Sequence, residues 1–262
     1  MDTRVKIGHV KPVVIDEDAF RANLPREEPP APTYVVIPVK GNHEYTDALV
    51  RQLADQGGAD GIYVYDNGSD SDPWPGIDAG EVVIPAAGLN IHEMWNAGIR
   101  KAIAENPRCN IAILNNDIEI GTGFLAELAH GLRVRPDVAA VCGNYDGREM
   151  VEAVQQVKGI AAGREDGTGG FAGFAFMVRG EIFAAGCPMF DERYEIWYGD
   201  NDFLLTLDAG SAVYGIVRDA KVRHIDGGSK TAGDGKGKRL TPELAAAAER
   251  DRIRFEKKWG AA

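Results

Sequence analysis

The sequence has 262 residues, 44% of them apolar, which is enough for one α/β domain with a substantial core. Its formal net charge of -11 argues against broad nucleic-acid binding, because such binding depends on a basic surface. No apolar run approaches the ~20 residues of a membrane-spanning helix, and the polar N-terminus lacks a signal-peptide core. We therefore expect a soluble, cytoplasmic protein with no transmembrane segment.

The first 32 residues are predicted to be an N-terminal extension, and residues 33–262 to form a single domain. The extension ends in a proline-rich stretch at 25–32, which is typical of a stiff, extended linker. Three widely spaced cysteines without a CxxC motif favour reduced structural thiols over a disulfide framework or a zinc site.

After the linker, strand and helix patterns alternate. Short apolar, β-branched runs predict buried strands, and apolar residues at helical spacing, such as Trp95, Ile99 and Ile103, predict helices. In chain order the predicted elements are a strand at 34–39, a helix at 44–56, strands at 62–65 and 81–84, a helix at 92–105, a strand at 111–114, a helix at 122–134 and a strand at 138–141. This order predicts a mostly parallel sheet with helices on both faces.

From about residue 150 the sequence is rich in glycine at first. It then predicts a strand at 174–178, a helix near 201–209 and two strands near 212–217 and 220–224. Thr241 followed by Pro242 is typical of a helix start, so a C-terminal helix is expected to run to about Lys258.

Polar clusters follow two of the predicted strands, where open parallel sheets bind their ligands. The cluster Asp66–Asp70 follows one strand, and its first carboxylate can accept hydrogen bonds from a base or ribose. The cluster Asn115–Asp117 follows another, and its carboxylate can hold a hard cation that bridges two phosphates. Both clusters are also compatible with ordinary turns.

Two further features carry possible chemistry. Tyr198–Asp202 opens a helix with two carboxylates at i and i+2, which face different directions, so that one can act as a base and the other as a structural group. Both could also simply be favourable acids at a helix N-terminus. His224 ends a strand, and a lone histidine in such a place is often structural. It is also the best second ligand for a metal on Asp117, because imidazole with carboxylate suits Mn²⁺.

The order of these features resembles the family-2, GT-A-fold glycosyltransferases, especially the rhamnosyltransferase-like branch, over roughly residues 33–230. The family's V-D-N-x-S motif corresponds to Val64–Ser69, and its D-x-D or L-N-x-D metal motif to Leu114–Asp117. The remaining matches are the N-rich segment Gly88–Gly98, the small-residue segment Gly170–Val178, the F-D-E-R-Y stretch Phe190–Tyr194, the E-D-x-D motif at Gly199–Asp202, and His224.

The resemblance implies a GT-A fold with a Rossmann-like central sheet, a smaller acceptor-side region and a C-terminal helix. Residues 33–145 would form the nucleotide-binding half and residues 146–262 the acceptor-binding half. The implied activity is metal-dependent, inverting transfer of a hexosyl-type sugar from a UDP or dTDP donor to a hydroxyl acceptor. That acceptor is an unidentified glycan, lipid-linked molecule or protein.

The resemblance also implies roles for individual residues. Asp200 is the expected base, with Asp202 as the fallback. Mn²⁺ or Mg²⁺ would be held by Asp117 and His224. The nucleotide-sugar would contact Pro38, Val39, Asp66, Asn67, Asn96, Asn115 and Asn116, and the acceptor would contact Gly173, Trp197 and Tyr198.

Two departures from the family pattern leave other functions open. Asn115 stands where many relatives have the first aspartate of D-x-D, and Gly199 replaces a glutamate that usually positions the acceptor. These two residues are the support for a non-catalytic nucleotide-sugar binding module. A sugar nucleotidyltransferase is disfavoured, because the loop Lys40–Glu44 has one glycine and no arginine. The glycine-rich stretch 226–239 could be a lid over the donor or a plain surface loop.

Overall fold

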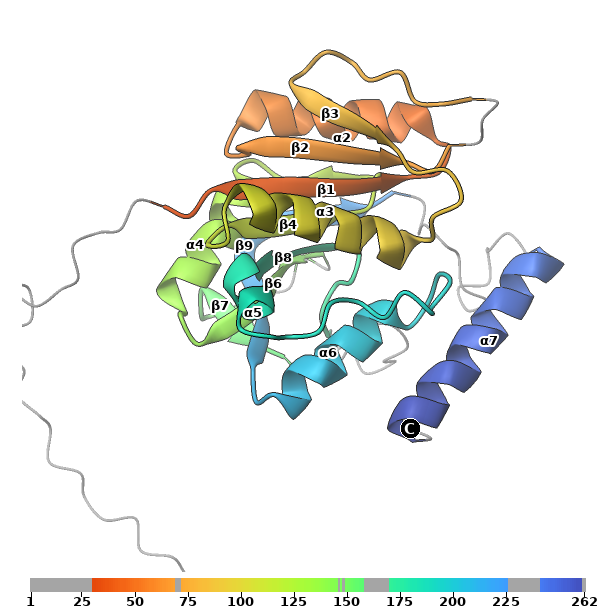
Figure 1. Ribbon diagram of the computed structural model, residues 1–262. Helices are drawn as coiled ribbons and strands as arrows, with labels where there is room; N and C mark the ends of the chain where they lie inside the picture. Colours follow the sequence, from red (N-terminus) through yellow and green to blue (C-terminus); the bar gives the residue numbers. More distant parts are fainter. Residues whose placement is uncertain are drawn as a thin grey trace, which may run out of the picture. The chain divides into compact units, whose positions relative to one another are not determined.

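The computed structural model describes residues 30–68, 72–145, 147, 149–157, 170–225 and 241–260. A mixed β-sheet runs through the described part of the chain (Figure 1). Its strands lie in the order β3 (Glu81–Pro85), β2 (Gly61–Asp66), β1 (Thr33–Val39), β4 (Asn110–Leu114), β8 (Ala175–Arg179), β6 (Val138–Asn144), β9 (Val213–His224) and β5 (Ile118–Ile120), and β7 (Val154–Gln156) also pairs with β9.

The first four strands of the chain are parallel, and β8 and β9 from the second half lie between strands of the first half. Strands β3, β2, β1 and β4 are mutually parallel, as expected for alternating strands and helices. Strand β8 runs antiparallel to both β4 and β6, while β9 is parallel to β6 and antiparallel to β5 and β7. The sheet is therefore mixed, and the prediction of a mostly parallel sheet holds for its first four strands.

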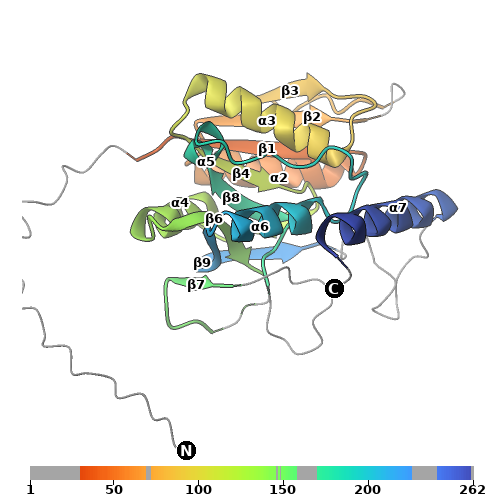
Figure 2. The same cartoon turned by 60° about the horizontal axis from the view of Figure 1, so that its bottom comes forward.

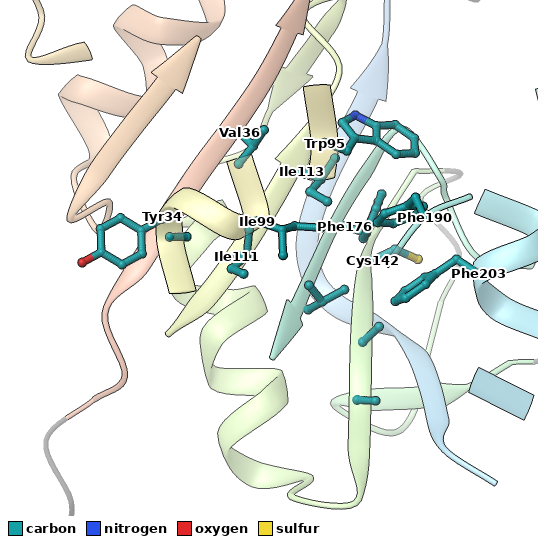
Figure 3. Packing of buried hydrophobic residues seen from close by; sticks show 14 of the residues in the cluster. Tyr34, Val36, Trp95, Ile99, Ile111, Ile113, Cys142, Phe176, Phe190 and Phe203 are labelled. Atoms are coloured by element: carbon teal, nitrogen blue, oxygen red, sulfur yellow. The ribbon is translucent and has the colours of Figure 1, made fainter. Parts of the chain in front are cut away.

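Helices cover both faces of the sheet, because its central strands are apolar on both sides (Figures 1 and 2). On one face, Val35 and Ile37 of β1 pack in a cluster with α2 (His43–Gln56) and α4 (Phe124–Val134). On the other, Val36 joins a cluster with α3 (Ile91–Glu105) and α6 (Gly199–Ala209), in which Trp95, Phe176, Phe190 and Phe203 lie together (Figure 3).

The last two helices are the short α5 (Gly180–Ala184) and the C-terminal α7 (Pro242–Trp259). Thr241 caps α7 by accepting a hydrogen bond from the N–H of Leu244, and Pro242 opens the helix, as the sequence predicted. None of the helices in the described ranges has both the length and the apolar character needed to cross a bilayer.

The α/β fold class with helices on both faces is confirmed, and the element boundaries differ in a few places. The two strands predicted at 212–217 and 220–224 are one strand, β9, because the chain continues without a turn between them. The sequence did not predict β5, β7 or α5, which span only three to five residues each. Elements this short carry too little periodicity to be recognised.

The parallel strands bring their carboxyl ends to one edge of the sheet. Val39 at the end of β1 is in register with Asp66 at the end of β2, and the Val39 carbonyl accepts a hydrogen bond of 2.8 Å from the N–H of Asn67. On the other side of β1, Val36 is in register with Ile113, so the residues after Leu114 reach the same edge. This edge is where ligands bind in folds of this class.

Candidate functional site

Asp117 and His224 come together at this edge of the sheet. Asp117 lies between β4 and β5, and His224 is the last residue of β9. Because β5 pairs antiparallel with β9, Ile118 lies opposite His224, and Asp117 Oδ1 is 3.5 Å from His224 Nε2. Burial raises the pKa of the Asp117 carboxyl, and the attraction of His224 opposes that rise only in part.

These two side chains fit a divalent cation, although they would not complete its coordination. Among the residues that the structure describes, no third histidine, cysteine, aspartate or glutamate joins them. Nearby in the chain, the Asn115 Oδ1 atom is buried and has no hydrogen-bond partner among the residues that the structure describes. A carboxylate and an imidazole suit Mn²⁺, and the remaining positions would be open to water and to diphosphate oxygens.

The side chain of Asp200 lies against the backbone of Gly173. A Cβ atom placed on Gly173 would be 1.9 Å from Asp200 Oδ2, so only glycine leaves room for this carboxylate. The Asp200 carboxylate accepts a hydrogen bond of 2.9 Å from the N–H of Asn201. Burial raises the pKa of Asp200.

Phe174 connects the Asp200 region with the Asp117–His224 pair. Its ring meets the His224 ring edge to face, with centroids 4.7 Å apart, and its carbonyl accepts a hydrogen bond of 2.8 Å from the N–H of Asn115. Gly173 and Phe174 are adjacent, so one short segment lies against Asp200 and also contacts His224 and Asn115. Asp117, Asp200 and His224 are thus brought to the same part of the molecule from three separate elements.

Asp202 is in a different situation from Asp200, two residues earlier. Asp202 is 2% exposed, and its carboxylate accepts hydrogen bonds from Tyr194, Lys258 and Trp259. These donors occupy both carboxylate oxygens. In this structure Asp200 is therefore the better placed of the two for proton transfer, and Asp202 links α6 to the C-terminal helix.

His92 was not singled out from the sequence, yet it lies beside the helix that carries Asp200. Its Nδ1 atom is 2.9 Å from the Tyr194 carbonyl, which can only accept, so Nδ1 carries the proton and Nε2 the lone pair. Burial lowers the pKa of His92 and favours this neutral form. A Cβ atom on Gly199 would be 1.9 Å from His92 Nε2. The imidazole therefore occupies the space that a side chain at position 199 would need.

The residues predicted at the nucleotide base stabilise their own loop. Asp66 is 5% exposed, and its carboxylate accepts hydrogen bonds from the N–H groups of Gly68 (2.5 Å) and Trp74 (2.7 Å). Asn67 donates to the Leu89 carbonyl at 2.6 Å and accepts from the N–H of Gly88. Both lie at the expected edge of the sheet, and their contact with a nucleotide stays a prediction.

Three predicted asparagines differ in how far their amides are engaged. Asn96 is 2% exposed and bonds to the backbone of Phe190 in both directions, as well as to Glu192. These bonds use the amide groups of Asn96 to hold the 190–192 segment. Asn116 donates to the Gly41 carbonyl and to Thr46, which ties the end of β4 to the start of α2. The Asn115 Oδ1 atom, in contrast, has no hydrogen-bond partner among the described residues.

The remaining predicted contacts are on β1 and before α6. Pro38 and Val39 are buried in β1, so only their backbone atoms could meet a ligand. Trp197 is partly buried, and its Nε1 atom is enclosed with no hydrogen-bond partner in the described part of the chain. Tyr198 adopts a left-handed backbone with φ 66° and its ring packs on Phe255. Ser69, Asp70 and the 226–239 stretch lie outside the described residues.

Comparison with known proteins gives partial sequence matches and solved structures with a similar fold. No protein-family model matches the chain. Curated proteins from Mycobacterium tuberculosis and Mycobacterium bovis, both described as uncharacterised, are 38% identical over 94 residues. Each match covers 36% of this chain and 34% of the relative, so the similarity spans about a third of those proteins.

Among solved structures, GalNAc-T7 with UDP, GalNAc and Mn²⁺ superposes with a TM-score of 0.57 at 13% identity, covering 89% of this chain and 57% of that one. Residues 1–349 of Staphylococcus aureus TarS give a TM-score of 0.51 at 12% identity, covering 75% of this chain and 61% of that one. At such identities the likeness concerns the fold. The chain therefore has the GT-A fold found in glycosyltransferases.

Proposed function

We propose that the protein is a metal-dependent, inverting glycosyltransferase that uses a UDP- or dTDP-linked sugar. The observation that carries the proposal is the grouping of Asp117 and His224 with Asp200 around the Gly173–Phe174 segment. The fold gives independent support, because the structural neighbour GalNAc-T7 was solved with UDP, GalNAc and Mn²⁺. Membership of the rhamnosyltransferase-like branch stays a prediction.

In the proposed reaction an acceptor oxygen attacks C1 of the donor sugar. The new C1–O bond forms as the bond from C1 to the diphosphate oxygen breaks, and the nucleoside diphosphate departs with the bonding electrons. Asp200 takes the proton of the acceptor hydroxyl as general base. Asp117 and His224 would hold the cation, which as a Lewis acid offsets the negative charge of the diphosphate.

The surroundings of Asp200 suit this role. Its carboxylate lies beside a glycine, so an acceptor hydroxyl could approach without meeting a side chain at position 173. Burial raises its pKa, which makes the carboxylate a stronger base than an exposed aspartate. Asp202 is enclosed by three donors and serves as a structural group in this mechanism.

Two experiments test the proposal. The protein is incubated with UDP- and dTDP-sugars and Mn²⁺, and release of the free nucleoside diphosphate is measured; slow release is expected even with water as acceptor. Asp200→Asn should lower this rate by about 10²-fold or more, since general base catalysis contributes on that scale. Absence of release with every donor would favour a non-catalytic binding module.

The metal assignment is tested separately by thermal shift. UDP with Mn²⁺ should raise the melting temperature of the native protein, and UDP without metal should raise it less. Asp117→Ala should remove the difference between the two conditions. If the metal-dependent shift survives in Asp117→Ala, Asp117 is not a ligand.

A further inference from the structure

The C-terminal helix α7 sends one buried carboxylate into the segment before Asp200. Asp251 is 0% exposed, and its two oxygens accept hydrogen bonds from three consecutive backbone N–H groups, at 2.9–3.1 Å. The donors are Glu195, Ile196 and Trp197. Successive N–H groups that converge in this way form an anion-binding concavity, and here the anion comes from the chain itself.

The end of the same helix holds the chain just after Asp200. Lys258 Nζ lies 2.7 Å and 2.9 Å from the two oxygens of Asp202, and Trp259 Nε1 is 2.7 Å from one of them. Between these two attachments, the Tyr198 ring packs on Phe255 of α7 with centroids 5.1 Å apart. Helix α7 thus contacts the chain on both sides of Asp200, and Figure 2 shows α7 beside α6.

This attachment is polar, unlike the packing of the other helices. In α7, only Ala247 and Asp251 are buried, whereas α3 and α4 each bury several large apolar side chains in the two cores. Buried ionic contacts add little net stability compared with apolar packing, but they impose one geometry. The contacts of α7 are therefore better suited to fixing the 195–202 segment than to stabilising the fold.

We propose that α7 positions the acceptor side of the site, with Asp251 and Lys258 as positioning residues. The inference rests on the proposed function, because it assigns these residues a task through Asp200 and Trp197. Asp251 fixes the backbone on which Trp197 stands, and Lys258 fixes the first turn of α6 through Asp202. Neither residue touches the reacting atoms.

The test is Asp251→Asn, which keeps the shape of the side chain but replaces one acceptor oxygen with a donor facing N–H groups. Hydrogen exchange at the amides of residues 195–197 should accelerate by about tenfold or more, as expected when the hydrogen bonds that protect them are lost. The kcat for UDP release from a UDP-sugar should fall by a similar factor, while the Kd for UDP with Mn²⁺ stays within about twofold of the native value.

Glu249→Gln is the matched control. It is on the same helix and removes an exposed ion pair with Arg252, so exchange, kcat and Kd should stay native. Native kcat and native amide protection in Asp251→Asn would overturn the proposal. If Asp251→Asn does not fold, Lys258→Met tests the second attachment with the same measurements, and an unchanged kcat there overturns it as well.

Different results would contradict the proposed function and the positioning role of α7. If the native protein releases no UDP from any donor, the proposed function fails. The exchange rates of amides 195–197 still report whether Asp251 orders this segment. Faster exchange together with unchanged turnover would leave α7 a purely structural helix and refute its positioning role.

Discussion

At the scale of single residues, the absence of a side chain at Gly173 is as informative as the presence of the carboxylate beside it. Gly173→Ala should displace Asp200, because the added Cβ would lie 1.9 Å from its Oδ2 atom. We expect turnover to fall by about 10²-fold, a loss typical of a misplaced catalytic group, with UDP and Mn²⁺ binding retained.

Gly210→Ala is the control for this substitution. Gly210 lies just after α6, and a Cβ atom there would find its nearest neighbours at 3.4 Å and 3.6 Å, which is ordinary van der Waals contact. Turnover of Gly210→Ala should match that of the native protein. Equal losses in the two variants would show that the effect at position 173 is not specific to Asp200.

His92 and Gly199 form a second complementary pair, which predicts a coupling between their substitutions. Gly199→Ala alone should destabilise the protein by about 1–3 kcal/mol, because its methyl group would overlap the imidazole. In a His92→Ala background that overlap is gone, so the same change should be nearly neutral. Urea unfolding of the four proteins gives the coupling energy, and additive effects would show that the two residues do not compete for this space.

The raised pKa of Asp200 also predicts a pH-dependent cost to stability. The folded state holds the proton of Asp200 more tightly than the unfolded chain does. The contribution of Asp200 to stability is therefore greatest below its ordinary pKa of 3.8, and it declines as the pH rises through the raised pKa of the folded state. Asp200→Asn cannot ionise, so at neutral pH it should melt at a higher temperature than the native protein. The difference should vanish at acid pH; a lower melting temperature of the variant at neutral pH would contradict this account.

At the scale of elements, the sequence predicts what depends on local pattern. The β-branched runs of β1, β2 and β4 place Asp66 and Asp117 at strand ends, and the parallel arrangement brings those ends to one edge. The prediction that pairs His224 with Asp117 rests on ligand chemistry and on resemblance, because local pattern does not place it there. Its position depends on the pairing of β5 with β9, and the three residues of β5 give no recognisable pattern.

Contacts between segments far apart in the chain could not be predicted from local sequence pattern. His92 and Gly199 are 107 positions apart, and nothing in the start of α3 indicates that its histidine fills a gap in α6. In the sequence, Asp251 is one of many charged residues on a C-terminal helix. Its burial depends on contact with the 195–197 segment, which the sequence does not indicate. Gly199 replaces a glutamate of the family pattern, and its contact with His92 gives a steric reason for the glycine.

At the scale of the whole molecule, the two halves of the sequence are interleaved in one sheet. Strand β8 lies between β4 and β6, and β9 lies between β6 and β5, so strands from after residue 170 separate strands from before residue 145. A fragment ending at residue 157 would lose the strand that joins β4 to β6 and would expose the edges of both.

Residues 30–157 alone should therefore fail to fold, even though they contain the predicted nucleotide-binding half. Residues 30–260 should unfold in a single cooperative transition, because β8 and β9 pair with strands that precede residue 157. Circular dichroism during heating distinguishes these cases. A cooperative melting transition in the 30–157 fragment, shifted upward by UDP, would show that the nucleotide-binding half is an independent folding unit and that β8 and β9 are additions to a complete sheet. Absence of such a transition would show that the nucleotide-binding half needs β8 and β9 to fold.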